Sequence, residues 1–95
     1  MSELLKEKFF PRNLYKILYY LSRQQTRDNK IIVGNIKKNF ENEISYPIIN
    51  QTLNLLRIEN LIKKKKGEDR REHIIELTEK GNQLLEILEK FNDFF

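Results

Sequence analysis

The sequence contains no cysteine and a single histidine, His73. The absence of cysteine excludes disulfide bonds, a zinc-finger site and a thiol redox switch, and one histidine is too few for a histidine-rich metal site. With only three glycines and two prolines, the composition favours ordered helices over a loop-rich fold. No apolar run approaches a bilayer-spanning length, and residues 1–8 lack the apolar core of a signal peptide. We therefore expect a soluble intracellular protein without metal, cofactor or membrane contact.

The residues that are present favour one folded domain. Hydrophobic residues make up 39% of the 95 residues, and six Phe and four Tyr supply bulky side chains for a core. A chain of this length forms one domain, and such a composition argues against intrinsic disorder. We expect a single domain over residues 1–95, in which residues 11–77 form the core and residues 78–95 form a C-terminal dimerisation helix.

The net charge of +4 is concentrated in one short segment. Residues 63–71, KKKKGEDRR, contain six basic and two acidic residues, whereas the rest of the chain contains twelve of each. All of the excess positive charge therefore lies in these nine residues. A concentrated basic patch is the electrostatic signature of a protein that binds a polyanion, although a lysine run alone is equally typical of a solvated loop.

Apolar spacing and turn residues predict a series of short elements. Pro11 suits the first turn of a helix, Ser45 and Thr78 are good N-caps, and Asn60 tolerates the left-handed conformation that ends a helix. After a short amphipathic turn at residues 2–9, the predicted order is helix, short strand, helix, helix, strand, strand and helix, at residues 11–24, 30–33, 34–40, 45–60, 61–65, 73–77 and 78–95. This is the order of a winged helix-turn-helix, a mainly α fold with a small β-hairpin wing (α+β).

Two stretches carry a resemblance to known regulators. Residues 56–62, LRIENLI, are similar to the segment that closes the recognition helix and leads into the wing in MarR-like and PadR-like proteins. Residues 69–81, DRREHIIELTEKG, resemble the MarR-family wing pattern, Asp-x-Arg, five residues, then Leu-Thr-x-x-Gly. MarR-like proteins are longer, with further helices that form the dimer and a ligand pocket. In size the chain resembles the compact winged-helix proteins of archaea and their viruses, so no small-molecule effector is expected.

The resemblance implies a transcription regulator that binds double-stranded DNA, with recognition helix 45–60 in the major groove and basic wing 63–76 on the backbone and minor groove. In the family, the acid at the position of Asp69 holds the arginine at the position of Arg71 for the minor groove. Asn and Gln can make bidentate contacts with adenine, whereas lysines contact phosphates. The alternative is that these polar residues are merely solvated. Expected DNA contacts are Ser45, Tyr46, Pro47, Asn50, Gln51, Asn54, Arg57, Lys63, Lys64, Lys65, Lys66, Asp69, Arg70 and Arg71.

The C-terminal helix carries a candidate dimer surface. Leu84, Leu88, Phe91 and Phe95 recur at spacings of four, three and four, as in an a/d ladder. A homodimer would place two recognition helices on successive major-groove turns, roughly 34 Å apart. Alternatively, the C-terminal phenylalanines close the core of the monomer. The expected dimer residues are Leu84, Leu85, Ile87, Leu88, Phe91, Phe94 and Phe95.

Nothing in the sequence predicts an enzyme. His73 is expected to be an ordinary strand residue, Tyr15, Tyr19 and Tyr20 are expected to pack, and the glycines are too scattered for a phosphate loop. The expected localisation is cytoplasmic, on the nucleoid. Two other functions remain open: a non-specific architectural or chromatin-like DNA-binding protein, which the lysine run favours, and a winged-helix protein-interaction module, against which the basic wing speaks.

Overall fold

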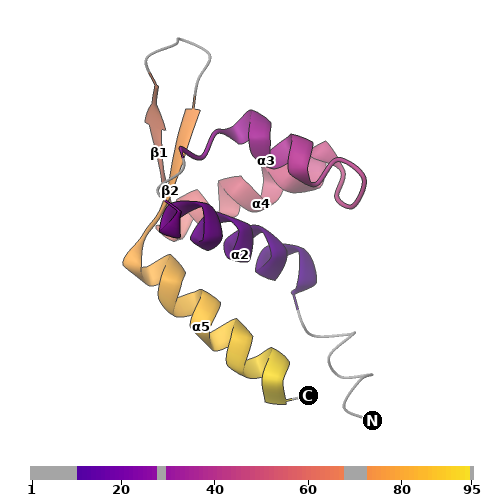
Figure 1. Cartoon of the computed structure of the whole chain (residues 1–95), viewed down its shortest axis with the longest axis vertical. Coiled ribbons are helices and arrows are strands. Elements are labelled where there is room, and N and C mark those ends of the chain that lie inside the picture. Colours follow the sequence, from indigo (N-terminus) through magenta and orange to yellow (C-terminus); the bar gives the residue numbers. More distant parts are fainter. Residues whose placement is uncertain (1–10, 28–29, 68–72, 95) are drawn as a thin grey trace.

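The computed structural model describes residues 11–27, 30–67 and 73–94 (Figure 1), so the turn predicted at residues 2–9 lies outside it. In Figure 1 the hairpin and α5 extend toward opposite ends of the long axis, and α5 runs beside α2. Within the described residues, no helix is both long and apolar enough to cross a membrane. The elements of the described chain are α2 (Arg12–Thr26), α3 (Val33–Asn39), α4 (Tyr46–Ile58), β1 (Ile62–Lys66), β2 (His73–Leu77) and α5 (Glu79–Phe94).

The core is built from one apolar face of each element. Residues three and four apart on a helix share a face, so α2 buries Ile17, Leu18 and Leu21 together. Burial of an isoleucine or leucine side chain contributes about 1.5–3 kcal/mol, which makes these stripes the main source of stability. The other helices and the hairpin bury Ile36, Ile49, Leu53, Leu56, Ile62, Ile75, Leu77, Leu85 and Leu88.

The short strand expected at residues 30–33 is reduced to a single bridge between Ile32 and Ile74. The amide of Ile75 donates to the Ile31 carbonyl at 2.8 Å, but α3 begins directly afterwards at Val33. The amides of Asn35 and Ile36 both donate to the Ile32 carbonyl, so the chain turns into a helix before a second pair can form. The other elements follow the predicted order, with boundaries within two residues of those expected.

Two tyrosines of α2 pack against the rim of the core, as expected. Tyr15 and Tyr20 are partly buried against it, and the Tyr20 ring meets the Phe40 ring edge-on at 5.6 Å between centroids. Burial raises the pKa of both phenols above the ordinary value. Tyr19 is more exposed and stacks on Tyr15, so all three residues have a packing partner.

The Leu-Thr-x-x-Gly pattern forms a tight junction between α4, β1 and α5. The Thr78 hydroxyl donates to the Asn60 carbonyl at 2.8 Å and accepts from the Gly81 amide at 3.1 Å, which makes Thr78 the N-cap of α5. A Cβ on Gly81 would lie 2.6 Å from the Leu77 Cδ1 atom and closer still to the Leu61 carbonyl oxygen. Gly81 is therefore required because α5 approaches the start of the hairpin too closely for any side chain.

Candidate nucleic-acid interface

Helix α4 separates an apolar inner face from a polar outer row. Ile49, Leu53 and Leu56 are buried at spacings of four and three. Asn50, Asn54 and Arg57 recur at the same spacings one residue further along, and all three are exposed. The Arg57 guanidinium donates to the Asn54 Oδ1 atom at 2.9 Å, which orders the row. All the helix residues expected to contact DNA are exposed: Ser45, Tyr46, Pro47, Asn50, Gln51, Asn54 and Arg57.

The C-terminal end of α4 is held rigidly by backbone bonds. Asn60 has a φ of 61°, the left-handed conformation expected for the residue that ends this helix. Its amide donates to the Arg57 carbonyl at 3.1 Å, and the Leu61 amide donates to the Leu56 carbonyl at 2.8 Å. These two bonds are those of a Schellman motif. The ammonium of Lys80 on α5 adds a bond to the Glu59 carbonyl at 2.9 Å, so α4 and α5 are linked directly.

The N-terminal end of α4 lies beside a basic residue of α3. Ser45 occupies the expected N-cap position with extended backbone, although its side chain makes no capping bond. Pro47 lies in the first turn, where a missing N–H is tolerated. The Lys37 ammonium lies 5.7 Å from the centre of the Tyr46 ring, a cation–π geometry. A positive charge and an exposed aromatic ring therefore flank the start of α4.

The hairpin divides the lysine run between its two faces. The antiparallel register places Lys63 opposite Glu76, Lys64 opposite Ile75, and Lys66 opposite His73. Alternate strand residues point to opposite faces, so Lys64 and Lys66 share the face of Ile62 and Ile75, while Lys63 and Lys65 share the face of Glu76. The four adjacent lysines are thus two pairs in different electrostatic surroundings.

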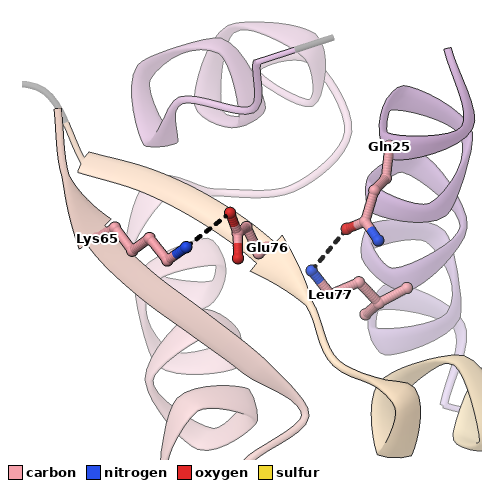
Figure 2. A network of polar contacts seen from close by, with 4 residues as sticks. All are labelled: Gln25, Lys65, Glu76 and Leu77. Atoms are coloured by element: carbon pink, nitrogen blue, oxygen red, sulfur yellow. Dashed lines mark hydrogen bonds and ion pairs between the residues drawn. The ribbon is translucent and has the colours of Figure 1, made fainter. Parts of the chain in front are cut away.

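Figure 2 shows the contacts that stabilise the Glu76 face and the end of β2. The Lys65 ammonium lies 3.1 Å from the Glu76 carboxylate, and both side chains are about half exposed. A surface pair of this kind contributes at most about 1 kcal/mol, but it neutralises one of the four lysine charges. Along the edge of β2 that does not pair with β1, the Leu77 amide donates to the Gln25 Oε1 atom at 2.9 Å.

A cleft of about 270 Å³ lies between the outer row of α4 and the hairpin. Lys64 reaches it from β1, and Asn50, Asn54 and Arg57 reach it from α4. Its floor is apolar, formed by the core side chains Leu53, Ile62 and Ile75 together with Val33. The structure thus joins four of the residues predicted from the sequence into one concave surface with two cationic groups and two amides.

Three predicted wing residues lie outside the described residues. Asp69, Arg70 and Arg71 fall in the segment 68–72 between β1 and β2, so the expected pairing of Asp69 with Arg71 stays a prediction. His73 begins β2 and is half-buried, as expected for a strand residue. The remaining expected wing residues, Lys63 to Lys66, are all exposed on β1.

The expected ladder on α5 is out of register with the observed packing. Gly81, Leu85 and Leu88 are buried in the core of this same chain, so Leu85 and Leu88 stabilise the monomer and not a dimer surface. Leu84, Ile87, Phe91 and Phe94 form a second row at spacings of three, four and three, in which Ile87 is 62% exposed and Phe94 82%. Phe95 lies outside the described residues. The close approach at Gly81 sets this register by turning that side of the helix inward.

Two features of the surface were not predicted. Gln25 gave no sequence signal, because a bond between its side chain and a strand 52 positions away depends on the tertiary fold. Ile48, Leu55 and Ile58 are exposed on α4 although they are large and apolar. The sequence shows that they recur with Gln51 at spacings of three, four and three residues, which places them in one row along α4, parallel to the row of Asn50, Asn54 and Arg57.

The comparisons with known proteins bear on the fold. No family model and no curated protein matches the chain. AF1382 from Archaeoglobus fulgidus superposes with a TM-score of 0.76 at 15% identity, over 94% of this chain and 93% of AF1382. A MepR variant from a multidrug-resistant S. aureus clinical isolate superposes with a TM-score of 0.74 at 23% identity, over 97% of this chain and 65% of that chain. The chain has a MarR-like winged-helix fold.

The winged-helix fold assigns a position to each of these elements. Helices α3 and α4 form the helix-turn-helix, α4 takes the position of the recognition helix, and the β1–β2 hairpin takes the position of the wing. The fold class expected from the element order is therefore confirmed. The chain spans 65% of the MepR chain.

Proposed function

We propose that the chain is a transcription regulator that binds double-stranded DNA as a homodimer. The observation that carries the proposal is the cleft in which Asn50, Asn54 and Arg57 of α4 face Lys64 of the hairpin. Groups that read base edges and groups that bind phosphate thus lie on one concave surface. One structural neighbour, MepR, is a transcriptional regulator of the MarR family, and its shared fold supports the same class for this chain.

In the proposed complex, α4 lies in the major groove and the hairpin lies along the phosphate backbone. The amides of Asn50, Gln51 and Asn54 pair with adenine edges, while Arg57 and the lysines of β1 bind phosphates. The resemblance of residues 69–81 to the MarR-family wing pattern implies that Asp69 would hold Arg71 for the minor groove, whose negative potential attracts guanidinium groups. No step in this mechanism is catalytic, and the proposed site of action is the nucleoid in the cytoplasm.

Replacement of Gln51 by alanine tests the sequence-reading role of α4. A bidentate contact with a base provides about 1–3 kcal/mol of discrimination, so Gln51→Ala is expected to weaken binding to a selected duplex by about 5- to 150-fold. Binding to a random duplex should stay unchanged, because that mode depends on phosphates. Duplexes enriched from a random library and titrated by fluorescence anisotropy provide the measurement. Equal loss on both duplexes would argue against base reading by Gln51.

The lysine run favours a second candidate, an architectural DNA-binding protein without sequence preference. Lys63 to Lys66 are exposed along one strand and their charge recognises only the phosphate backbone. Specific regulators bind their sites about 10³–10⁷ times more tightly than random duplex, whereas a ratio near one would support the architectural role. Absence of any duplex binding at low salt would instead bring forward a protein-interaction module.

The second row of α5 supports the proposed dimer. Leu84, Ile87, Phe91 and Phe94 recur at the a/d spacing of coiled coils beside the buried row, and Leu84 also packs against the core. Helix α5 is also bonded to the end of α4 through Lys80 and Thr78. A two-fold contact along this row would therefore place the two α4 helices in a defined relation to each other.

Replacement of Ile87 by lysine tests this contact. Because Ile87 is 62% exposed in the single chain, Ile87→Lys should preserve folding, yet it would introduce two charges into a two-fold interface. We expect the variant to sediment as a monomer at concentrations where the wild-type chain is a dimer. Asn82→Lys is the matched control, since it adds the same charge on the same helix at an exposed position outside the row. Unchanged sedimentation of Ile87→Lys would exclude this row as the interface.

A further inference from the structure

The outer face of α4 carries an apolar row that neither the core nor the cleft uses. Ile48 is 42% exposed, Leu55 61% and Ile58 57%, and they align with Gln51 at spacings of three, four and three. We name Ile48, Leu55 and Ile58 the apolar row. It runs along α4 parallel to the polar row of Asn50, Asn54 and Arg57, and the residues of both rows are exposed.

Single exposed apolar residues are ordinary, but an aligned group of large ones marks a contact surface. From Ile48 to Ile58 the helix rises about 15 Å, the length of roughly four base pairs of DNA. The row includes the position of Gln51 and does not line the basic cleft, but Ile58 lies one helical turn beyond Asn54, which does line it. A ligand that spans both rows of α4 therefore also meets Arg57 and Lys64. The positive charge of that cleft therefore favours a polyanionic partner over an apolar protein surface.

We propose that the apolar row reads thymine, through contact of Leu55 and Ile58 with the C5-methyl groups in the major groove. This inference rests on the proposed DNA-binding function. The major groove is about 12 Å wide and admits a whole helix, so both rows meet base edges together. The thymine methyl is the apolar group that base edges present there, and Asn and Gln pair with adenine. The two rows together recognise both partners of an A·T pair, which makes the target A+T-rich.

Substitution of uracil for thymine tests the proposal, because uracil lacks only the methyl group. A duplex enriched from a random library is prepared with thymine or with uracil at the enriched A·T positions, and anisotropy gives both dissociation constants. The wild-type chain should bind the uracil duplex about fourfold more weakly for each buried methyl lost. In the Leu55→Ala, Ile58→Ala double variant, the two duplexes should bind equally. Its thermal unfolding, followed by circular dichroism, establishes that the variant is folded.

Gln51→Ala is the matched control on the same face. It should weaken binding to both duplexes by one factor and leave the thymine-to-uracil ratio intact, because it removes a polar contact and not a methyl contact. Tight wild-type binding with a ratio of one would overturn the inference and leave the proposed function standing. If the double variant keeps the wild-type thymine-to-uracil ratio and also changes its oligomeric state, the apolar row is instead a protein contact. Absence of enrichment of any duplex would overturn both the inference and the proposed function.

Discussion

Replacement of Gly81 by alanine is expected to lower the free energy of unfolding by about 3 kcal/mol. The added Cβ would lie 2.6 Å from the Leu77 side chain and would press on the Leu61 carbonyl. That carbonyl cannot yield easily, since it accepts the Thr78 amide at 3.1 Å and the Thr78 hydroxyl at 3.0 Å. For a domain of this size the midpoint of thermal unfolding, Tm, should fall by roughly 10–20 °C.

Gly34→Ala is the matched control for Gly81→Ala. Gly34 is also helical, but a Cβ there would meet no atom within 4 Å. The same substitution should therefore raise stability by up to about 1 kcal/mol, because alanine restricts the unfolded chain more than glycine does. Urea unfolding of both variants, monitored by circular dichroism, gives the two free energies. Equal effects of the two substitutions would contradict the close approach at the α5 junction.

Loss of Lys64 and Lys66 is expected to weaken DNA binding more than loss of Lys63 and Lys65. Each lysine that neutralises a phosphate contributes about 0.9 to the slope of log affinity against log salt. The double substitution of Lys64 and Lys66 by glutamine should reduce the magnitude of that slope by roughly two and the affinity in 0.1 M salt by roughly 50-fold. These two lysines lie on the face shared with the cleft, and Lys64 lines it.

The double substitution of Lys63 and Lys65 by glutamine provides the control with an identical change in net charge. Lys65 already pairs with Glu76, and Lys63 lies directly opposite the same carboxylate. Their removal should therefore lower the positive potential that faces DNA by less than the removal of Lys64 and Lys66. Titrations of one duplex at several salt concentrations separate the two variants. Equal slopes for both variants would show that the wing binds through general attraction and not through one face.

Local patterns predicted the fold and the exposure of the α4 residues that we propose to contact DNA. The apolar spacing of α4 required an outer face containing Asn50, Gln51 and Asn54, and the structure exposes all three. Asn60 was predicted to end α4 from its tolerance of the left-handed conformation, and its φ of 61° agrees. These features follow from interactions between residues that are close in the sequence, so the sequence alone predicts them.

The packing of α5 and the division of the lysine run depend on contacts between distant elements, which the sequence pattern does not show. On α5, several residues had apolar spacing, and the ladder built on Leu84 and Leu88 mixed the two rows. The buried row is selected by Gly81, because only a residue without a side chain allows that side of α5 to approach β1. The division of the four lysines between two faces likewise depends on how β1 pairs with β2, and the amino-acid composition does not show that pairing.

The bond between Gln25 and the Leu77 amide has a consequence for aggregation. A two-stranded hairpin exposes an outer edge on each strand, and free edges template pairing with other chains. On β2, the amides of Ile75 and Leu77 are occupied by the Ile31 carbonyl and by the Gln25 side chain. On β1, the edge is a run of lysines, which repels a second identical edge. These contacts and charges protect both outer edges of the hairpin from strand-to-strand polymerisation, which leaves the helices for the self-association that we propose.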